Sequence, residues 1–137
     1  MSSAPFLISA AALAFGAALG LKGLLDPAWA GKLVRLQAEN GQPEGFAEFR
    51  STLGGMFFGL HLVALALLVF GEPQVGVGAC LILAAGWLFT AGGRFMAYKL
   101  DPDCKHKHVI TSIIIEVVAG LLIMVFPVAK MFQSFSS

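Results

Sequence analysis

The sequence predicts an all-α membrane protein, a bundle of four transmembrane helices with both termini outside the cytosol. Of the 137 residues, 58% are hydrophobic and only 12% are charged, whereas an average soluble domain is about 45–50% apolar and about 25% charged. The apolar residues form four runs of about 20 residues, each long enough for a helix to cross the roughly 30 Å hydrocarbon core. The positive charges gather in two of the loops. At this length we expect a single domain over residues 1–137.

The four apolar runs predict the four helices. Their length and the lack of strict polar–apolar alternation do not fit membrane β-strands. A backbone in lipid must satisfy its own hydrogen bonds, so helices are the expected structure. The predicted helices cover residues 5–25, 49–70, 75–98 and 109–132.

The three connections differ in length and chemistry. The first, residues 26–48, begins with Asp26 and Pro27, a plausible N-cap followed by proline at the first helical position. Residues 28–38 mix apolar and basic side chains, which predicts a short amphipathic helix on the membrane surface. The second connection, residues 71–74, is a tight turn and makes its two helices antiparallel neighbours. The third, residues 99–108, is short and charged.

The first apolar run has one feature of a signal peptide, because Ala28, Trp29 and Ala30 resemble a cleavage site. A signal peptide carries positive charges before its apolar part, and residues 1–20 have none. The first basic residue, Lys22, follows the run, which favours a transmembrane helix inserted with its N-terminus outward.

The basic residues predict the orientation of the chain. Eight of the nine lie in or beside the first and third connections, and the ninth, Lys130, lies near the C-terminus. The positive-inside rule therefore places loops 26–48 and 99–108 in the cytosol and both termini outside it. We expect a multi-pass protein of a bacterial inner membrane. The eight are Lys22, Lys32, Arg35, Arg50, Arg94, Lys99, Lys105 and Lys107.

Four ionisable residues lie within or at the edge of the predicted helices: Arg50, His61, Arg94 and Glu116. A charge at mid-bilayer costs about 2.5–3.5 kcal/mol on insertion scales, so such side chains usually face other helices and pair. Helix rise places Glu116 about 10 Å and Arg94 about 7 Å from the same cytosolic edge. We expect an ion pair between Arg94 and Glu116. Arg50 enters at that edge and shares Glu116 or pairs with Glu48.

Small residues beside these charges predict close helix contacts. Gly54 lies on the same face of the second helix as Arg50, and Gly55 and Gly59 form a small-xxx-small pair on an adjacent face. Gly93 precedes Arg94 in the third helix. These helix-packing glycines suggest that the charges face neighbouring helices and line a cavity open to the cytosolic half.

Two structural alternatives stay open for these polar residues. The arginines and Glu116 are also compatible with an ion-pair network that only holds the helices in register. His61 is compatible with a proton relay or with a neutral, hydrogen-bonded core histidine. Sequence alone does not decide between these roles.

The third connection contains five residues of metal-ligand type. The lysines between them repel a cation, and their spacing matches no known metal pattern, so we expect no metal site. Contact with anionic lipid is the better interpretation of this basic loop. The five are Asp101, Asp103, Cys104, His106 and His108.

The sequence contains no nucleophile motif, no glycine-rich phosphate loop and no nucleic-acid signature. We therefore expect no catalytic residue and no nucleic-acid partner, and an enzyme is the least favoured class.

Several short motifs from the second helix onward resemble a bacterial family. They are Glu48-Phe49-Arg50, Leu53-Gly54-Gly55, Gly59, Gly93-Arg94, Asp101-Pro102 and Glu116. The family comprises small four-helix membrane proteins of unknown function and is loosely similar to DoxX-like proteins. The resemblance implies that Arg50, Gly54, Gly55, Gly93, Arg94 and Glu116 belong to one site, and it implies no activity.

These observations predict a small integral membrane binding or accessory protein. Arg50 and Arg94 would hold an amphipathic anionic molecule, such as a membrane lipid or a quinone, or dock a partner subunit, and Glu116 would orient Arg94. One alternative is a proton- or ion-coupled transporter that uses Glu116 and His61 and works as a homo-oligomer. Another is a purely structural subunit of a larger membrane complex.

Overall fold

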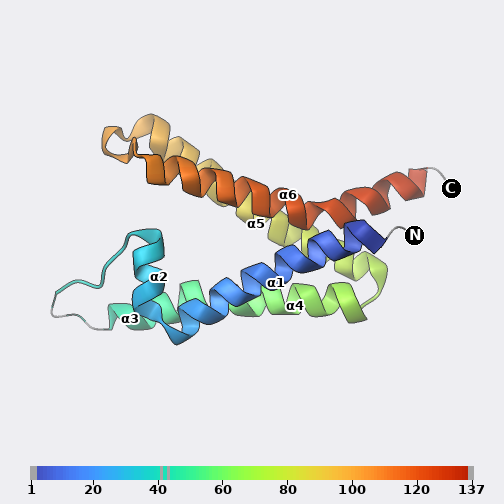
Figure 1. Ribbon diagram of the computed structural model, residues 1–137, viewed down its shortest axis with the longest axis horizontal. Helices are drawn as coiled ribbons and strands as arrows, with labels where there is room; N and C mark the ends of the chain where they lie inside the picture. The colour runs from blue at the N-terminus through green and yellow to red at the C-terminus, as the bar shows by residue number, and fades with distance from the viewer. Residues whose placement is uncertain (1–2, 41, 43, 136–137) are drawn as a thin grey trace. The chain divides into compact units, whose positions relative to one another are not determined.

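The computed structural model describes residues 3–40, 42 and 44–135, and within them the chain is helical without a strand (Figure 1). The elements in chain order are α1 (Ser3–Leu25), α2 (Pro27–Val34), α3 (Gly45–Glu48), the π-helix η1 (Phe49–Met56), α4 (Phe57–Phe70), α5 (Pro73–Leu100), the 3-10 helix η2 (Pro102–Cys104) and α6 (Lys107–Phe135).

Four long helices of the described chain are apolar enough to cross a membrane, as predicted, which indicates a multi-pass membrane protein. They cover Ala4–Leu25, Gly45–Phe70, Pro73–Leu100 and Lys107–Phe135. All four extend beyond the predicted residues 5–25, 49–70, 75–98 and 109–132, and the second begins inside the predicted loop 26–48. Pro73 fits the first turn of a helix, where its missing N–H is not needed. The longer helices include Lys99 and Lys107, whose long side chains can keep their charged ends in water while the backbone stays helical.

The predicted surface helix within residues 28–38 is α2, and it is shorter than expected. It begins at the Asp26 cap, whose side chain accepts a hydrogen bond from the Trp29 backbone N at 3.0 Å. It ends because Arg35 adopts the left-handed conformation, with φ 59°. The Leu36 N–H then donates to the Gly31 carbonyl at 2.9 Å, the bond that closes a Schellman motif.

The chain divides into two compact units. The first unit combines residues 1–12 with residues 67–137, and the second unit covers residues 13–66.

Within the second unit, α1 packs against η1 and α4 through three glycines. Gly16, Gly20 and Gly23 follow one another at spacings of four and three, so they share one face of α1. A Cβ at Gly20 would overlap the backbone of Phe58, and one at Gly23 would lie 2.9 Å from the Leu53 carbonyl oxygen. Small residues of this kind let two membrane helices approach closely.

The partner glycine on η1 is Gly54, where a Cβ would lie 2.5 Å from the backbone of Leu24. Gly55 is looser, because its nearest neighbour would be at 3.7 Å. A Cβ at Gly59 would meet nothing within 4 Å, so the close contact expected there is not made within the described residues. α1 crosses on the Gly54 face instead of the adjacent one.

The π-helix η1 covers eight residues, Phe49–Met56. The hydroxyls of Ser51 and Thr52 both donate to the Glu48 carbonyl oxygen. Such side-chain bonds compete with the backbone ladder, and π-turns often occur at functional sites. Within η1, Arg50 is exposed and Gly54 is buried, and both lie against Leu24 at the end of α1.

In the first unit, α5 and α6 form an antiparallel hairpin connected through η2 (Figure 1). Gly120 of α6 marks the close approach, because a Cβ there would lie 2.8 Å from the Leu88 side chain and 3.2 Å from the Ala84 carbonyl oxygen. Cys80, Ala84 and Ile123 are completely buried. This hairpin positions Arg94 of α5 and Glu116 of α6.

α6 bends along its length (Figure 1), and Pro127 lies inside the helix. Proline has no N–H, so the carbonyl of Ile123 loses its normal helical partner. The buried Ser9 hydroxyl of α1 donates to that carbonyl at 2.9 Å and accepts the Phe126 N–H at 3.0 Å. A side chain from another helix thus replaces the hydrogen bond that the proline removes.

Candidate functional site

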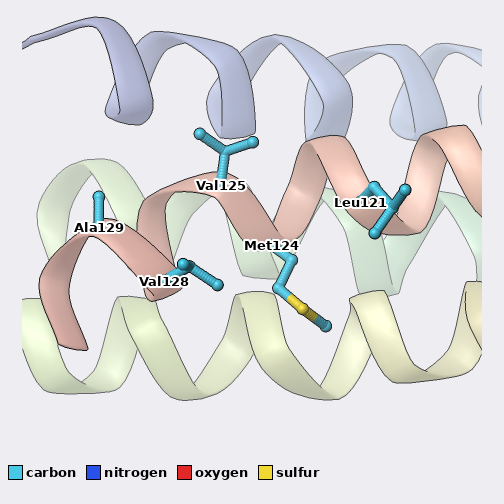
Figure 2. A pocket seen from close by; sticks show the side chains of 5 residues that line it. All are labelled: Leu121, Met124, Val125, Val128 and Ala129. Carbon is cyan, nitrogen blue, oxygen red and sulfur yellow. The ribbon is translucent and has the colours of Figure 1, made fainter. Parts of the chain in front are cut away.

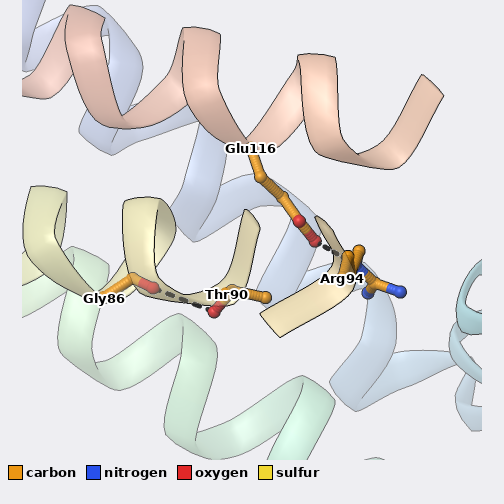
Figure 3. A network of polar contacts seen from close by, with 4 residues as sticks. All are labelled: Gly86, Thr90, Arg94 and Glu116. Carbon is orange, nitrogen blue, oxygen red and sulfur yellow. Dashed lines mark hydrogen bonds and ion pairs between the residues drawn. The ribbon is translucent and has the colours of Figure 1, made fainter. Parts of the chain in front are cut away.

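Arg94 of α5 and Glu116 of α6 form the ion pair expected from their depths. Arg94 Nε lies 2.6 Å from Glu116 Oε1 (Figure 3). The α5–α6 hairpin brings the two residues together although they are 22 positions apart in the sequence. Glu116 reaches α5 because it shares the buried face of α6 with Gly120 and Ile123.

The two partners differ in exposure. The Glu116 side chain is 8% exposed and the Arg94 side chain is 34% exposed. Only Nε of the guanidinium is bonded to Glu116, and its two terminal nitrogens lie on the side away from the carboxylate (Figure 3). Within the described residues these terminal nitrogens make no hydrogen bond. The buried carboxylate therefore holds an outward-facing cation.

The second carboxylate oxygen, Glu116 Oε2, is buried and has no hydrogen-bond partner among the described residues. Leaving a buried polar group unpaired costs about 1–3 kcal/mol, and more for a charged group. Buried unpaired groups are few in native proteins, and each calls for an explanation. The unpaired Oε2 of Glu116 therefore calls for an explanation.

Other polar atoms of this part of α5 are satisfied within the helix. The Thr90 hydroxyl, one turn before Arg94, donates to the Gly86 carbonyl at 2.8 Å (Figure 3). Gly93 would tolerate a Cβ without any neighbour within 4 Å in the described chain, so it makes no close helix contact there. The site reduces to Arg94 and Glu116.

Arg50 belongs to the second unit, where it has a structural partner. Its Nη1 donates to the backbone carbonyl of Leu24 in the last turn of α1. A basic side chain in this position satisfies an orphan carbonyl and complements the negative end of the helix dipole. Within the described residues no ion pair joins Arg50 to Glu48, which is exposed. The expectation of that pair is not met, because Arg50 caps α1 instead.

His61 is a buried residue of α4 and only 1% exposed. Its Nδ1 lies 2.8 Å from the Phe57 carbonyl oxygen, which can only accept, so Nδ1 carries a proton. The ring also packs on Phe57, with 4.3 Å between ring centroids, and on Gly16, where a Cβ would overlap the imidazole. Of the two roles that the sequence allowed, this environment is typical of a hydrogen-bonded core histidine and not of a proton relay.

Sequence reasoning missed Ser9 and the α1 glycines. Ser9 is the only hydroxyl residue between residues 4 and 21, and Pro127 is the only proline within the fourth span. A lone serine in one span and a lone proline in another could have indicated that the serine hydroxyl bonds the carbonyl that the proline leaves without a donor. The spacing of Gly16 and Gly20 is the G-x-x-x-G pattern of membrane helix contacts.

Two further regions carry no polar site. An open hollow of about 320 Å³ on α6 is lined by apolar side chains alone (Figure 2). In the described chain no three His, Cys, Asp or Glu residues stand close enough to hold a metal ion, the loop between α5 and α6 included. The residues that line the hollow are Leu121, Met124, Val125, Val128 and Ala129.

The resemblance to the DoxX-like family stays a prediction from short motifs. Comparison of the chain with protein families, curated proteins and solved structures finds no match.

Proposed function

We propose that this chain is a small membrane binding protein that holds the acidic headgroup of an amphipathic molecule at Arg94. The asymmetry of the Arg94–Glu116 pair carries this proposal. Glu116 occupies only Nε of the guanidinium, and the two terminal nitrogens point outward from the hairpin (Figure 3). A carboxylate that only neutralised Arg94 could bond any of the three guanidinium nitrogens. Bonding through Nε alone leaves both terminal nitrogens available to a ligand.

The two terminal nitrogens of the Arg94 guanidinium indicate the class of ligand. Guanidinium presents a planar fork of donors that matches phosphate and carboxylate oxygens. Arg94 lies about 9 Å before the end of α5, at about 1.5 Å per residue, so its side chain reaches toward the level of the lipid headgroups. A phospholipid fits both features. A quinone, whose carbonyl oxygens also accept hydrogen bonds, is the alternative ligand for the same edge.

The proposal includes an orientation. The connection between α5 and α6 and the adjoining helix ends, which carry Lys99, Lys105 and Lys107, would face the cytosol, together with loop 26–48. Both termini would then lie outside it, and the Arg94 site would serve the cytosolic leaflet of the inner membrane. Arg50 would add positive charge on the same side while it caps α1.

Trp87 provides a built-in reporter for this site. It precedes Arg94 by seven residues, which places both on one face of α5, and it is partly exposed. In a Trp29→Phe protein, brominated phosphatidylglycerol should quench Trp87 more than brominated phosphatidylcholine in otherwise identical bilayers. Arg94→Gln should remove that preference, because the amide keeps a similar size without the charge.

Lys130→Gln is the matched control, because it removes one positive charge from α6 and leaves the Arg94–Glu116 pair unchanged. The proposal fails if Arg94→Gln and Lys130→Gln leave the same lipid preference. If Arg94→Gln lowers thermal stability without changing lipid preference, the pair is a structural strut, and the assembly-subunit alternative is favoured.

The unpaired Glu116 Oε2 favours one second candidate, a proton- or ion-coupled transporter that works as an oligomer. A buried carboxylate with one unbonded oxygen is a suitable group for taking up and releasing a proton. Reconstituted vesicles with an imposed pH gradient test this function. Glu116→Gln should abolish the flux, whereas equal flux in the wild type and the variant would exclude it.

A further inference from the structure

α2 begins where the first membrane span ends. The span Ala4–Leu25 is followed by Asp26 and then by α2 (Pro27–Val34), so no linker separates the two helices. Within the second unit α2 runs across the axis of α1 (Figure 1). If α1 crosses the bilayer, this geometry lays α2 along its surface.

The two faces of α2 differ in what they contact. Ala30 and Gly31 are buried, and a Cβ on Gly31 would lie 2.8 Å from the Leu36 carbonyl oxygen and 3.1 Å from the Phe49 ring. On the outer side, Leu33 is 49% exposed and Leu36 is 57% exposed. The second unit therefore presents leucines beside the end of a membrane span.

Basic side chains accompany these leucines. Lys22 Nζ lies 5.2 Å from the centroid of the Trp29 ring and 3.6 Å from Asp26. Lys32 and Arg35 are exposed and form no ion pair within the described residues. A tryptophan beside exposed leucines and unpaired basic residues is the composition of a helix that lies in a membrane interface.

The acidic groups of the second unit form no ion pair with Lys32 or Arg35 within the described residues, and Glu44 and Glu48 are exposed. Asp26 caps α2 through the Trp29 N–H and also faces Lys22. Glu39 accepts a hydrogen bond from the Gln42 amide at 2.9 Å. Lys32 and Arg35 are therefore basic side chains of this surface that no carboxylate of the described residues pairs with.

Arg35 stands in a backbone conformation that suits glycine better. Its φ of 59° is the one positive value among the described non-glycine residues, and it closes the Schellman motif of α2. A left-handed conformation costs an ordinary L-residue roughly 1–2 kcal/mol. Residues with such backbone strain cluster at functional sites, and the side chain that Arg35 presents here is an exposed guanidinium.

We propose that α2, together with Arg35 and Leu36, is an interfacial anchor that binds anionic phospholipid headgroups. Trp29, Leu33 and Leu36 enter the boundary between headgroups and acyl chains, and Lys32 and Arg35 contact the phosphates. The surface lies entirely in the second unit, so this inference does not depend on the site at Arg94.

Trp29 reports on this anchor in a Trp87→Phe protein. The full-length protein is reconstituted in phosphatidylcholine bilayers that contain an equal fraction of either brominated phosphatidylglycerol or brominated phosphatidylcholine. Trp29 should be quenched by both lipids and more strongly by phosphatidylglycerol. The double variant Lys32→Gln/Arg35→Gln should lower the relative binding constant for phosphatidylglycerol by roughly fivefold for each charge removed.

Three variants separate charge from backbone strain and from general electrostatics. Arg35→Lys should keep the lipid preference, and Arg35→Gly should lose about fivefold of it although glycine suits the backbone better. Lys130→Gln removes a charge outside the second unit and should change nothing at Trp29. The proposal is overturned if neither lipid quenches Trp29, if both quench it equally, or if the double variant keeps the wild-type preference.

Discussion

Ser9 shows how a single buried hydroxyl takes part in two helices. Its oxygen lies 2.9 Å from the Ile123 carbonyl oxygen and 3.0 Å from the Phe126 nitrogen, beside Pro127. A hydroxyl inserted into a helical ladder is a known cause of bending, as is the proline itself. Phe6 packs edge-on against Phe126 at 5.8 Å between ring centroids and supports the same contact. The bend in α6 therefore depends on α1 as well as on its own proline.

We expect Ser9→Ala to destabilise the protein by about 1–2 kcal/mol, because it leaves the Ile123 carbonyl without a donor. Pro127→Ala supplies a new N–H for that carbonyl, so the same Ser9→Ala change should cost much less in the Pro127→Ala background. Thermal unfolding in detergent of the four proteins in this double-mutant cycle measures the coupling.

Ser134→Ala is the control for this cycle, because Ser134 is exposed and its hydroxyl donates to the Met131 carbonyl of its own helix. It should change stability little in either background. An equal cost of Ser9→Ala with and without Pro127 would contradict the repair of the α6 backbone by Ser9.

Among the helices of the second unit, α1 packs closely against η1 and α4 because glycines, which have no side chain, lie at the contact. Gly20 and Gly54 each face backbone atoms of the opposite helix. Lipid offers no hydrophobic drive for two helices to associate, so close van der Waals packing has to provide it. The contact also places the end of α1 close to η1, so that Arg50 can donate a hydrogen bond to the Leu24 carbonyl.

Gly20→Ala should destabilise the second unit by about 1–3 kcal/mol, because the added methyl group overlaps the Phe58 backbone, which cannot rotate away. Gly59→Ala makes the same chemical change at a site with no neighbour within 4 Å, and it should alter stability by no more than about 0.5 kcal/mol. Thermal unfolding of both variants tests the contact, and equal effects would argue against it.

At the scale of the whole molecule, the four candidate spans and the position of the basic residues set the topology we propose. The two cysteines make it testable without adding a probe to the loop. Cys104 lies partly exposed in the connection between α5 and α6, and Cys80 is completely buried.

In spheroplasts of a bacterial host, a membrane-impermeant maleimide should leave Cys104 unlabelled until the membrane is permeabilised. Gln133→Cys in a Cys104→Ser background should be labelled at once, because Gln133 is exposed near the C-terminal end of α6. Labelling of Cys104 in intact spheroplasts would reverse the proposed orientation.

The four spans and the pairing of Arg94 with Glu116 could be predicted from the sequence. Both follow from position along a helix axis, because a fixed rise per residue converts sequence number into depth. Two opposite charges at one depth in consecutive antiparallel helices have few other ways to avoid lipid. The surface helix after Asp26 was predicted for a similar local reason, its cap and its amphipathic pattern.

The face of each helix that meets a neighbour could not be predicted and is seen only in the three-dimensional structure. Gly54 rather than Gly59 contacts α1, and Arg50 caps α1 rather than pairing with Glu48. The repair of α6 by Ser9 also joins residues more than a hundred positions apart. These contacts depend on how two helices cross, and a helix with small residues on several faces allows several crossings of similar energy.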